Sequence, residues 1–386
     1  MSMQKYLFSS KLPPKTGLNS GGGAQSTRRR DMRSKLEFTP ISWDKYFTGK
    51  NDVLINGSSF RTYTLGDTGP AIVLLHGGGY SALSWSLLSA KLAELVECQL
   101  LALDLRGHGN TSTPSDDDLS IETLANDVVE VINTVYDECT PIILIGHSLG
   151  GSIAVHAAHH PNLKSLIGLV VIDVVEGTAL SALSSMQSIL RGRPQCFNSV
   201  EEAIRWSVQS GQLKNIDSAR VSMPGQIKNL NTNKLATEEI QMDTPEEIEE
   251  SKVRVPLAGV ESISEEEESQ FKVPGTLHGK YGWRIDLRAT EIFWPAWFQG
   301  LSKLFLSCEA QKLLLLASLD RLDTDLTVAQ MQGKFEIHAF EQSRGRCGHA
   351  IHEDIPDAVA EVLATYLVRN MFAKRKYEFP SVMPCC

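Results

Sequence analysis

Pro141-Ile142-Ile143-Leu144-Ile145-Gly146-His147-Ser148-Leu149-Gly150 is the stretch that decides the interpretation of this chain. An apolar run leads into a Gly-x-Ser-x-Gly motif, and small residues that suit a helix follow it. The order predicts a strand, a sharp turn and a helix, which is the context of a nucleophile elbow. Glycines two positions either side of Ser148 leave room for the strained turn. We therefore expect an exposed Ser148 hydroxyl at a helix N-terminus, with the backbone N–H of Leu149 as an oxyanion donor.

Apolar runs and amphipathic stretches alternate on both sides of this motif. Such alternation predicts βαβ units, hence an α/β fold with a mostly parallel central sheet flanked by helices on both faces. Catalytic groups are then expected at the carboxyl ends of the strands. The expected strands span 60–65, 71–75, 99–103, 141–145, 166–172, 312–317 and 335–340, and the clearest expected helices span 84–95 and 119–136.

Composition places the chain among large soluble proteins. With 386 residues and 42% hydrophobic content it can bury a sizeable core in a single domain. The longest apolar run, 166–172, is too short to cross a bilayer, and no signal peptide is evident, so no membrane partner is expected. Seven cysteines without paired spacing indicate a reducing compartment, cytoplasmic and/or nuclear, and no metal or cofactor site. The net charge of −9 argues against a nucleic acid partner.

Charge also divides the chain into regions. Residues 231–270 hold twelve acidic and three basic side chains, so we expect a disordered acidic insertion there. It would lie inside a helical lid at about 177–300. The organisation expected is a flexible tail at 1–35, a catalytic domain at 36–375 and a C-terminal tail at 376–386.

A glycine-rich turn predicts the second half of the oxyanion hole. His76-Gly77-Gly78-Gly79 follows the expected strand 71–75, where glycines let backbone N–H groups approach a substrate. Gly78 is the expected donor, and Gly79 is a close rival. The turn at 104–109 is typical of this kind of sheet, and we expect it to be structural and without a catalytic residue.

A serine hydroxyl needs a base, and His349 fits best among ten histidines. It lies in Cys347-Gly348-His349-Ala350, in a loop after the expected strand 335–340, which gives the chain order serine, acid, histidine. His352 is the rival. His147, inside the elbow, is expected to pack beside Ser148 rather than to act as its base.

Two aspartates compete for the role of the acid that orients the histidine. Asp173 follows the expected strand 166–172, and Asp320 follows the expected strand 312–317. Either carboxylate could fix the imidazole tautomer, while the other would form an ion pair or cap a turn. The residue pattern by itself leaves both possibilities open.

Longer blocks carry a resemblance that the five-residue motif does not. They lie at 172–179 (Ile-Asp-Val-Val-Glu-Gly-Thr-Ala), 185–187, 191–194 (Arg-Gly-Arg-Pro), 218–223, 281–285 (Tyr-Gly-Trp-Arg-Ile), 294–302 and 329–335. From about residue 38 to 373 the chain resembles the protein phosphatase methylesterases, members of the α/β-hydrolase superfamily. The resemblance implies a triad of Ser148, Asp173 and His349. The approach to the histidine, residues 342–347, is a few residues longer than in that family and is expected to bulge into solvent.

The resemblance also implies a substrate and a partner. The reaction would be hydrolysis of the methyl ester on the C-terminal leucine of the type 2A protein phosphatase catalytic subunit. A general small-molecule carboxylesterase and a non-catalytic inhibitor that binds the phosphatase are the alternatives. Large lid residues would either line a pocket for the leucine side chain or pack the core of the lid. These residues are Met186, Trp206, Met223, Trp283 and Trp294.

Overall fold

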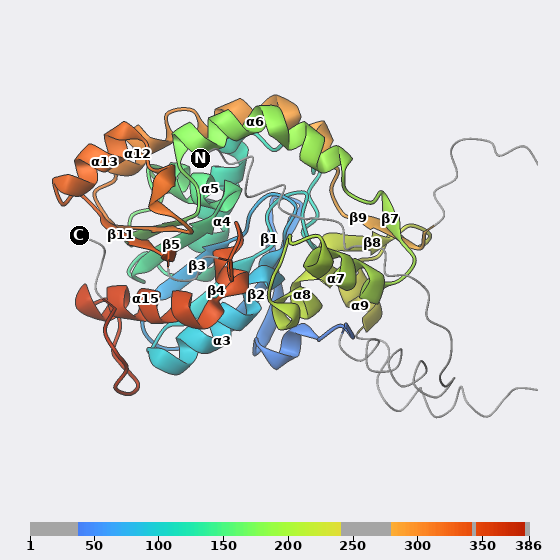
Figure 1. Ribbon diagram of the computed structural model, residues 1–386. Helices are drawn as coiled ribbons and strands as arrows, with labels where there is room; N and C mark the ends of the chain where they lie inside the picture. The colour runs from blue at the N-terminus through green and yellow to red at the C-terminus, as the bar shows by residue number, and fades with distance from the viewer. Residues whose placement is uncertain (1–37, 241–278, 342–344, 383–386) are drawn as a thin grey trace, which may run out of the picture.

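An eight-stranded sheet forms the centre of the molecule in this computed structural model, which describes residues 38–240, 279–341 and 345–382. Its strand order is β1-β2-β4-β3-β5-β6-β10-β11 (Figure 1). Strand β2 pairs antiparallel with β1 and β4, and the remaining pairs are parallel, which confirms a mostly parallel sheet. Strand β1 was not among the expected strands. The strands are β1 (Gly49–Ile55), β2 (Ser58–Leu65), β3 (Ala71–Leu75), β4 (Gln99–Leu103), β5 (Ile142–His147), β6 (Leu166–Ile172), β10 (Gln311–Leu316) and β11 (Glu336–Ala339).

Helices cover both faces of this sheet because its central strands are apolar at nearly every position. Along β3, Val73 and Leu75 point into one core cluster, and Ile72 and Leu74 into the other. The first cluster is closed by α4 (Ile121–Val135) and α5 (Leu149–Ala157), and the second by α3 (Ser86–Leu95) and α15 (Pro356–Arg369), as Figure 1 shows. Side chains of a strand alternate between faces, so a continuous apolar run requires a helix layer on each.

The segment between β6 and β10 forms the expected lid, and it holds strands as well as helices. Three short antiparallel strands, in the order β7-β9-β8, lie beside α7 to α9 (Figure 1). Sequence periodicity did not indicate strands of two or three residues. The lid elements are α6 (Glu176–Arg191), β7 (Cys196–Phe197), α7 (Val200–Gln209), α8 (Ile216–Ser222), η3 (Met223–Gln226), β8 (Ile227–Asn229), α9 (Ala236–Ile240), β9 (Tyr281–Trp283), η4 (Leu287–Phe293), α11 (Trp294–Phe298) and α12 (Leu301–Ser307). The shorter helices elsewhere are η1 (Trp43–Lys45), η2 (Ala82–Trp85), η5 (Leu319–Arg321), α13 (Thr324–Met331) and α14 (Ile351–Asp354).

The large apolar residues of the lid pack in two places: Trp206, Met223 and Trp283 in a cluster of the lid, and Met186 and Trp294 against the main core. Met223 is fully buried, and the rings of Trp206 and Trp283 lie 5.5 Å apart in one aromatic cluster with Phe197. Trp294 is buried in the main core, and its indole N–H donates to Thr290. Of the two possibilities for these residues, lining a pocket or packing a core, their surroundings match packing.

Two expected boundaries are wrong at their edges. Residues 231–240, placed in the disordered insertion, are folded: Leu235 and Ala236 are buried, and Glu239 accepts hydrogen bonds from Asn229 Nδ2 and Tyr281 Oη. Their apolar side chains fill a gap in the lid, which the net charge of the segment concealed. The rest of that insertion lies outside the described residues, as does the expected tail at 1–35.

The expected C-terminal tail is also partly packed. Phe379 is buried under the guanidinium of Arg375, and the backbone N–H of Val382 donates to Thr365 Oγ1 of α15. The folded domain therefore continues to residue 382 rather than ending at 375. The apolar residues of this short segment follow no period from which its packing could be predicted.

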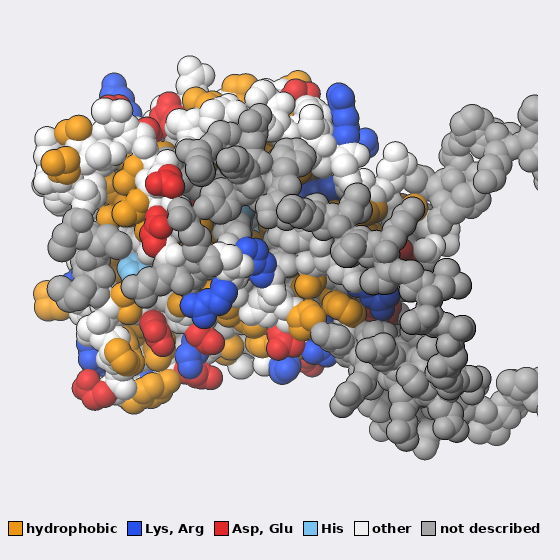
Figure 2. All heavy atoms as spheres, viewed as in Figure 1, with side chains coloured by type: hydrophobic (Ala, Val, Ile, Leu, Met, Phe, Trp, Pro, Cys, Tyr) orange, Lys and Arg blue, Asp and Glu red, His pale blue; other side chains and the backbone are white. Residues whose placement is uncertain are grey.

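The face of the molecule drawn in Figure 2 carries acidic and basic side chains interspersed with one another. None of the helices in the described parts of the chain is both long enough and apolar enough to cross a membrane.

Candidate active site

Ser148 occupies the strained turn that the motif predicts. Its φ is 53° and its ψ −120°, and α5 begins at the next residue. A Cβ on Gly146 would lie 2.1 Å from the carbonyl oxygen of Gly150, and one on Gly150 would lie 2.2 Å from that of Leu75. Neither contact is sterically possible, so only glycine fits at these two positions. The N–H of Ser148 donates to the carbonyl of Ile172 at 3.0 Å, which joins the turn to β6.

The structure brings Asp173 to the ring of His349. Asp173 Oδ2 lies 2.8 Å from His349 Nδ1, and Oδ1 accepts the backbone N–H of Ala317 at 3.0 Å. The Asp173 side chain is completely buried, while 46% of the His349 side chain is exposed. Asp320, the rival, lies on the exposed turn η5. A buried carboxylate bonded to one ring nitrogen leaves the other free to act as a base.

His147 packs beside these residues, as expected, and it also supports the histidine loop. Its Nε2 donates to the carbonyl oxygen of His349 at 2.9 Å, and the two rings lie 4.7 Å apart. Complete burial, with a smaller effect of His349, lowers the pKa of His147 to about 3. A neutral ring with its proton on Nε2 is therefore the form that donates to the His349 carbonyl.

His352, the rival base, belongs to the core. Its ring is fully buried and lies 4.2 Å from that of Trp85 and 4.5 Å from that of His147. Burial holds its pKa well below the usual value. Its environment is that of a packed aromatic ring.

The geometry of the glycine turn distinguishes Gly78 from Gly79. The N–H of Gly79 donates to His108 Nε2 at 2.9 Å, so it is already engaged. A Cβ on Gly78 would lie 3.6 Å from Cδ2 of Leu149, which places Gly78 next to the other expected donor. Within the described residues, no partner takes the N–H of Gly78.

His108 is a residue whose role the sequence did not reveal. It lies in the turn 104–109, and its Nδ1 donates to the carbonyl of Arg106 at 2.8 Å, which leaves Nε2 as the acceptor for Gly79. Burial lowers its pKa to about 4, so the ring stays neutral and able to accept. Through this hydrogen bond, the turn at 104–109 also fixes the conformation of the glycine turn at 76–79. No local pattern signals a contact between residues 29 positions apart.

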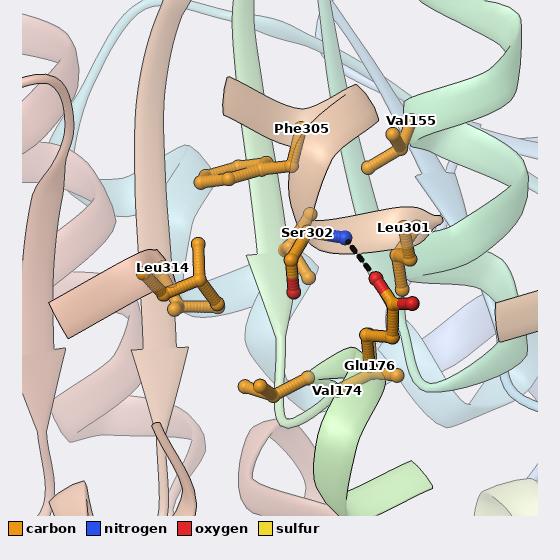
Figure 3. A pocket seen from close by; sticks show the side chains of 10 residues that line it. Val155, Val174, Glu176, Leu301, Ser302, Phe305 and Leu314 are labelled. Carbon is orange, nitrogen blue, oxygen red and sulfur yellow. Dashed lines mark hydrogen bonds between the residues drawn. The ribbon is translucent and has the colours of Figure 1, made fainter. Parts of the chain in front are cut away.

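The strand end at Asp173 continues into a second network. Glu176, at the start of α6, accepts the backbone N–H groups of Gly300 at 2.8 Å and Ser302 at 3.0 Å. Figure 3 shows this carboxylate at the edge of a small pocket lined by apolar side chains, with Phe305 and Leu314 opposite it. Ser302 Oγ donates in turn to Asp323 at 2.5 Å. The network joins α6 to α12 and thereby fixes the segment that follows the acid.

The residues expected as nucleophile, acid, base and oxyanion donors therefore gather at one edge of the sheet. They follow β5, β6, β11 and β3, whose carboxyl ends meet there. Within the part of the chain that the structure describes, no hydrogen bond joins Ser148 Oγ to the His349 ring, and no cluster of His, Cys, Asp or Glu could hold a metal ion. Catalytic hydrogen bonds are often long before a substrate binds. Such a set of groups suits acyl transfer.

Comparison with known proteins agrees with this geometry. The model of the alpha/beta hydrolase family matches residues 72–362. Among solved structures, E-2-(acetamidomethylene)succinate hydrolase superposes with a TM-score of 0.58 at 16% identity, covering 83% of this chain and 99% of that one. An M. tuberculosis esterase superposes with a TM-score of 0.54 at 19% identity, covering 83% and 92%. These likenesses confirm the fold.

Curated relatives are much more similar in sequence. The protein named protein phosphatase methylesterase 1 is 47% identical in Homo sapiens and 46% identical in Mus musculus, over 100% of both chains in each comparison. A Caenorhabditis elegans protein named probable protein phosphatase methylesterase 1 is 38% identical over 89% of this chain and 81% of its own. This chain therefore belongs to the protein phosphatase methylesterase family, whose members are carboxylic ester hydrolases with the α/β hydrolase fold.

Proposed function

We propose that this chain hydrolyses the methyl ester on the C-terminal leucine of the type 2A protein phosphatase catalytic subunit. The observation that carries the proposal is the extent of the similarity. Identity of 46–47% runs over the whole length, lid included, to proteins named as phosphatase methylesterases. Similarity confined to the catalytic core would not indicate a substrate, because enzymes of one fold act on unrelated substrates. Similarity that extends through the lid favours a shared substrate. We place this activity in the cytoplasm and/or nucleus, with no nucleic acid partner.

Ser148 is the proposed nucleophile. His349 takes the hydroxyl proton on Nε2 while Oγ attacks the ester carbonyl, because Nδ1 is held by the Asp173 carboxylate 2.8 Å away. The negative charge that develops on the carbonyl oxygen is stabilised by the N–H groups of Leu149 and Gly78. The position of Leu149 at the first turn of α5 favours this role, since N–H groups there lack helical partners.

Collapse of the tetrahedral intermediate expels methanol, which takes its proton from His349. A water molecule then attacks the acyl-enzyme, with His349 as base again. The ester bond to Ser148 breaks, and the leucine carboxylate is released with Ser148 protonated. Asp173 stays ionised throughout and stabilises the imidazolium that forms twice in each cycle.

The test compares three substrates under the same conditions. They are phosphatase catalytic subunit with a carboxymethylated C-terminal leucine, an unrelated methylated peptide and a simple aryl ester. We expect methanol release from the phosphatase with much weaker use of the methylated peptide. Equal kcat/KM for all three would support the general carboxylesterase instead.

Ser148→Ala separates catalysis from binding. The change removes one oxygen, so turnover should disappear while affinity for the phosphatase persists, because the interface lies mostly outside that atom. A pull-down with purified phosphatase measures the binding. Wild-type protein that binds the phosphatase but releases no methanol would indicate the non-catalytic inhibitor.

A further inference from the structure

The loop that carries His349 is held by two lid contacts that lie outside the triad. Lys214, between α7 and α8, extends its ammonium group to the carbonyl oxygens of Gly345 and Cys347, at 2.9 and 3.1 Å. These carbonyls belong to the approach to the histidine, residues 342–347, which the resemblance led us to expect to be longer than in the family. Residues 342–344 lie outside the described residues, so the expected bulge into solvent is untested, but the part from Gly345 onward is attached to the lid.

Asp354 holds the same loop from its other side. One carboxylate oxygen accepts the N–H of Gly348 at 2.6 Å, and the other accepts the N–H of Lys214 at 2.7 Å. Asp354 is buried, and a Cβ on Gly348 would lie 3.5 Å from its oxygen and 4.0 Å from Cε of Lys214. Gly348 is thus enclosed between the two side chains. A buried carboxylate that accepts two amide N–H groups fixes both backbone segments.

A third contact joins α14 to the lid. Glu353, beside Asp354 in α14, is fully buried and accepts the hydroxyl of Ser218 in α8 at 2.8 Å. The backbone that precedes His349 is therefore fixed to the lid. The carbonyl group of His349 itself is held by His147, at the end of β5. The ring of His349 remains 46% exposed, so these backbone contacts and Asp173 determine where its Nε2 points.

We propose that Lys214 and Asp354 are positioning residues for the catalytic histidine, and that the lid thereby forms part of the proton-transfer machinery. The inference rests on the proposed roles of Ser148 and His349. The observation behind the inference is that Asp354 holds the backbone N–H of Gly348, the residue directly before His349. A loosened loop would let Nε2 leave the line to Ser148 Oγ, and a displacement of about 1 Å can reduce a rate by roughly 100-fold.

The main test uses Lys214→Met, with Lys214→Arg as the conservative variant and Lys234→Met as the matched control. Lys214 and Lys234 are both exposed lysines of the lid, and only the former reaches the histidine loop. The first readout is the second-order rate at which a fluorophosphonate probe labels Ser148, which needs His349 as base whatever the natural ester is. The second is kcat and KM on the methylated phosphatase.

We expect Lys214→Met to lower the labelling rate and kcat about tenfold or more, with KM and the melting temperature nearly unchanged. Lys214→Arg should recover most of both rates, because a guanidinium can donate to the same carbonyls. Lys234→Met should match the wild type. In addition, the low-field proton NMR signal of His349 Nδ1–H should broaden in Lys214→Met, since its bond to Asp173 becomes less ordered.

A second variant, Asp354→Asn, keeps the shape of the wild-type side chain. It places an amide N–H against the N–H of Gly348 or of Lys214, so one contact is lost, and we expect a similar loss in kcat. Labelling of Lys214→Met at the wild-type rate would overturn the inference, as would a loss confined to KM or a loss that Lys214→Arg does not recover. Wild-type protein that is labelled but does not demethylate the phosphatase would refute the proposed substrate alone. Wild-type protein that resists labelling would refute the triad and the inference together.

Discussion

Asp173→Asn tests the acid most directly because the structure determines how the new amide would be oriented. Oδ1 accepts the N–H of Ala317 at 3.0 Å, and this acceptor has to remain an oxygen. The NH₂ group of the asparagine then faces His349 Nδ1, 2.8 Å from the replaced Oδ2. Two donors cannot face each other, so the ring takes the tautomer with its proton on Nε2, which cannot accept the proton of Ser148.

The expected loss is therefore large in rate and small in stability. In the serine protease triad the same change lowers kcat by about four orders of magnitude, which corresponds to about 5.4 kcal/mol in activation free energy. Folding is affected less, because the shape of the side chain is unchanged and the bond to Ala317 is kept. We expect a melting temperature within a few degrees of the wild type.

The assay measures methanol release from the methylated phosphatase beside a thermal melt of the same preparation. Asp320→Asn is the control, since Asp320 was the competing acid and lies on an exposed turn. It should keep kcat within about twofold of the wild type, in line with the small effects of surface substitutions.

A folded Asp320→Asn protein without activity, together with an Asp173→Asn protein that keeps most of its activity, would refute the reasoning. Loss of activity in Asp173→Asn accompanied by unfolding would also contradict the expectation of a preserved fold. Demonstrably folded protein is needed for both variants because an unfolded one imitates a catalytic loss.

Three further predictions concern the elbow, a buried acid and the acidic insertion. Gly150→Ala places a methyl group 2.2 Å from the carbonyl oxygen of Leu75, so we expect the free energy of unfolding, measured by urea titration, to fall by at least about 1–3 kcal/mol. Gly177→Ala is the control and should have little effect, because its nearest contact would be at 3.5 Å. Burial raises the pKa of Glu353 from its usual 4.5 to about 8. Between these two pH values the folded chain holds a proton that the unfolded chain has released. The free energy of unfolding therefore falls as the pH rises, by up to ~1.36 kcal/mol per pH unit. Glu353→Gln, which stays neutral, should flatten the urea midpoint measured between about pH 5 and pH 8, and an unchanged slope would contradict this assignment. Deletion of residues 241–270 with a short linker should leave the melting temperature and activity near those of the wild type. Deletion of 231–270 should lower the melting temperature, because it also removes the buried side chains of Leu235 and Ala236. Equal melting temperatures for the two deletions would contradict the packing of residues 231–240.

The sequence by itself determined the elbow and seven of the eight strands of the central sheet, but not the edge strand β1. The expected strands 71–75, 99–103 and 166–172 match β3, β4 and β6 in full, because a strand buried on both faces is apolar at consecutive positions. The turn at Ser148 was also predicted from neighbouring residues, since the motif lies between a strand and a helix pattern. The clash that excludes a side chain at Gly146 is within the motif, whereas the one at Gly150 is with Leu75 of β3. The family resemblance then favoured Asp173, which the residue pattern had left level with Asp320.

Only the tertiary structure decided how these residues are held. The N–H of Gly79 is taken by His108, which distinguishes it from Gly78, and the histidine loop is attached to the adjoining Asp354 and to Lys214 of a distant segment. The strands of the small lid sheet are two or three residues long, and β7 pairs with β9, which follows it in the chain only after β8. Periodicity records only which face of an element is buried, whereas these contacts depend on where the chain returns in space, and no pattern of neighbouring residues encodes that.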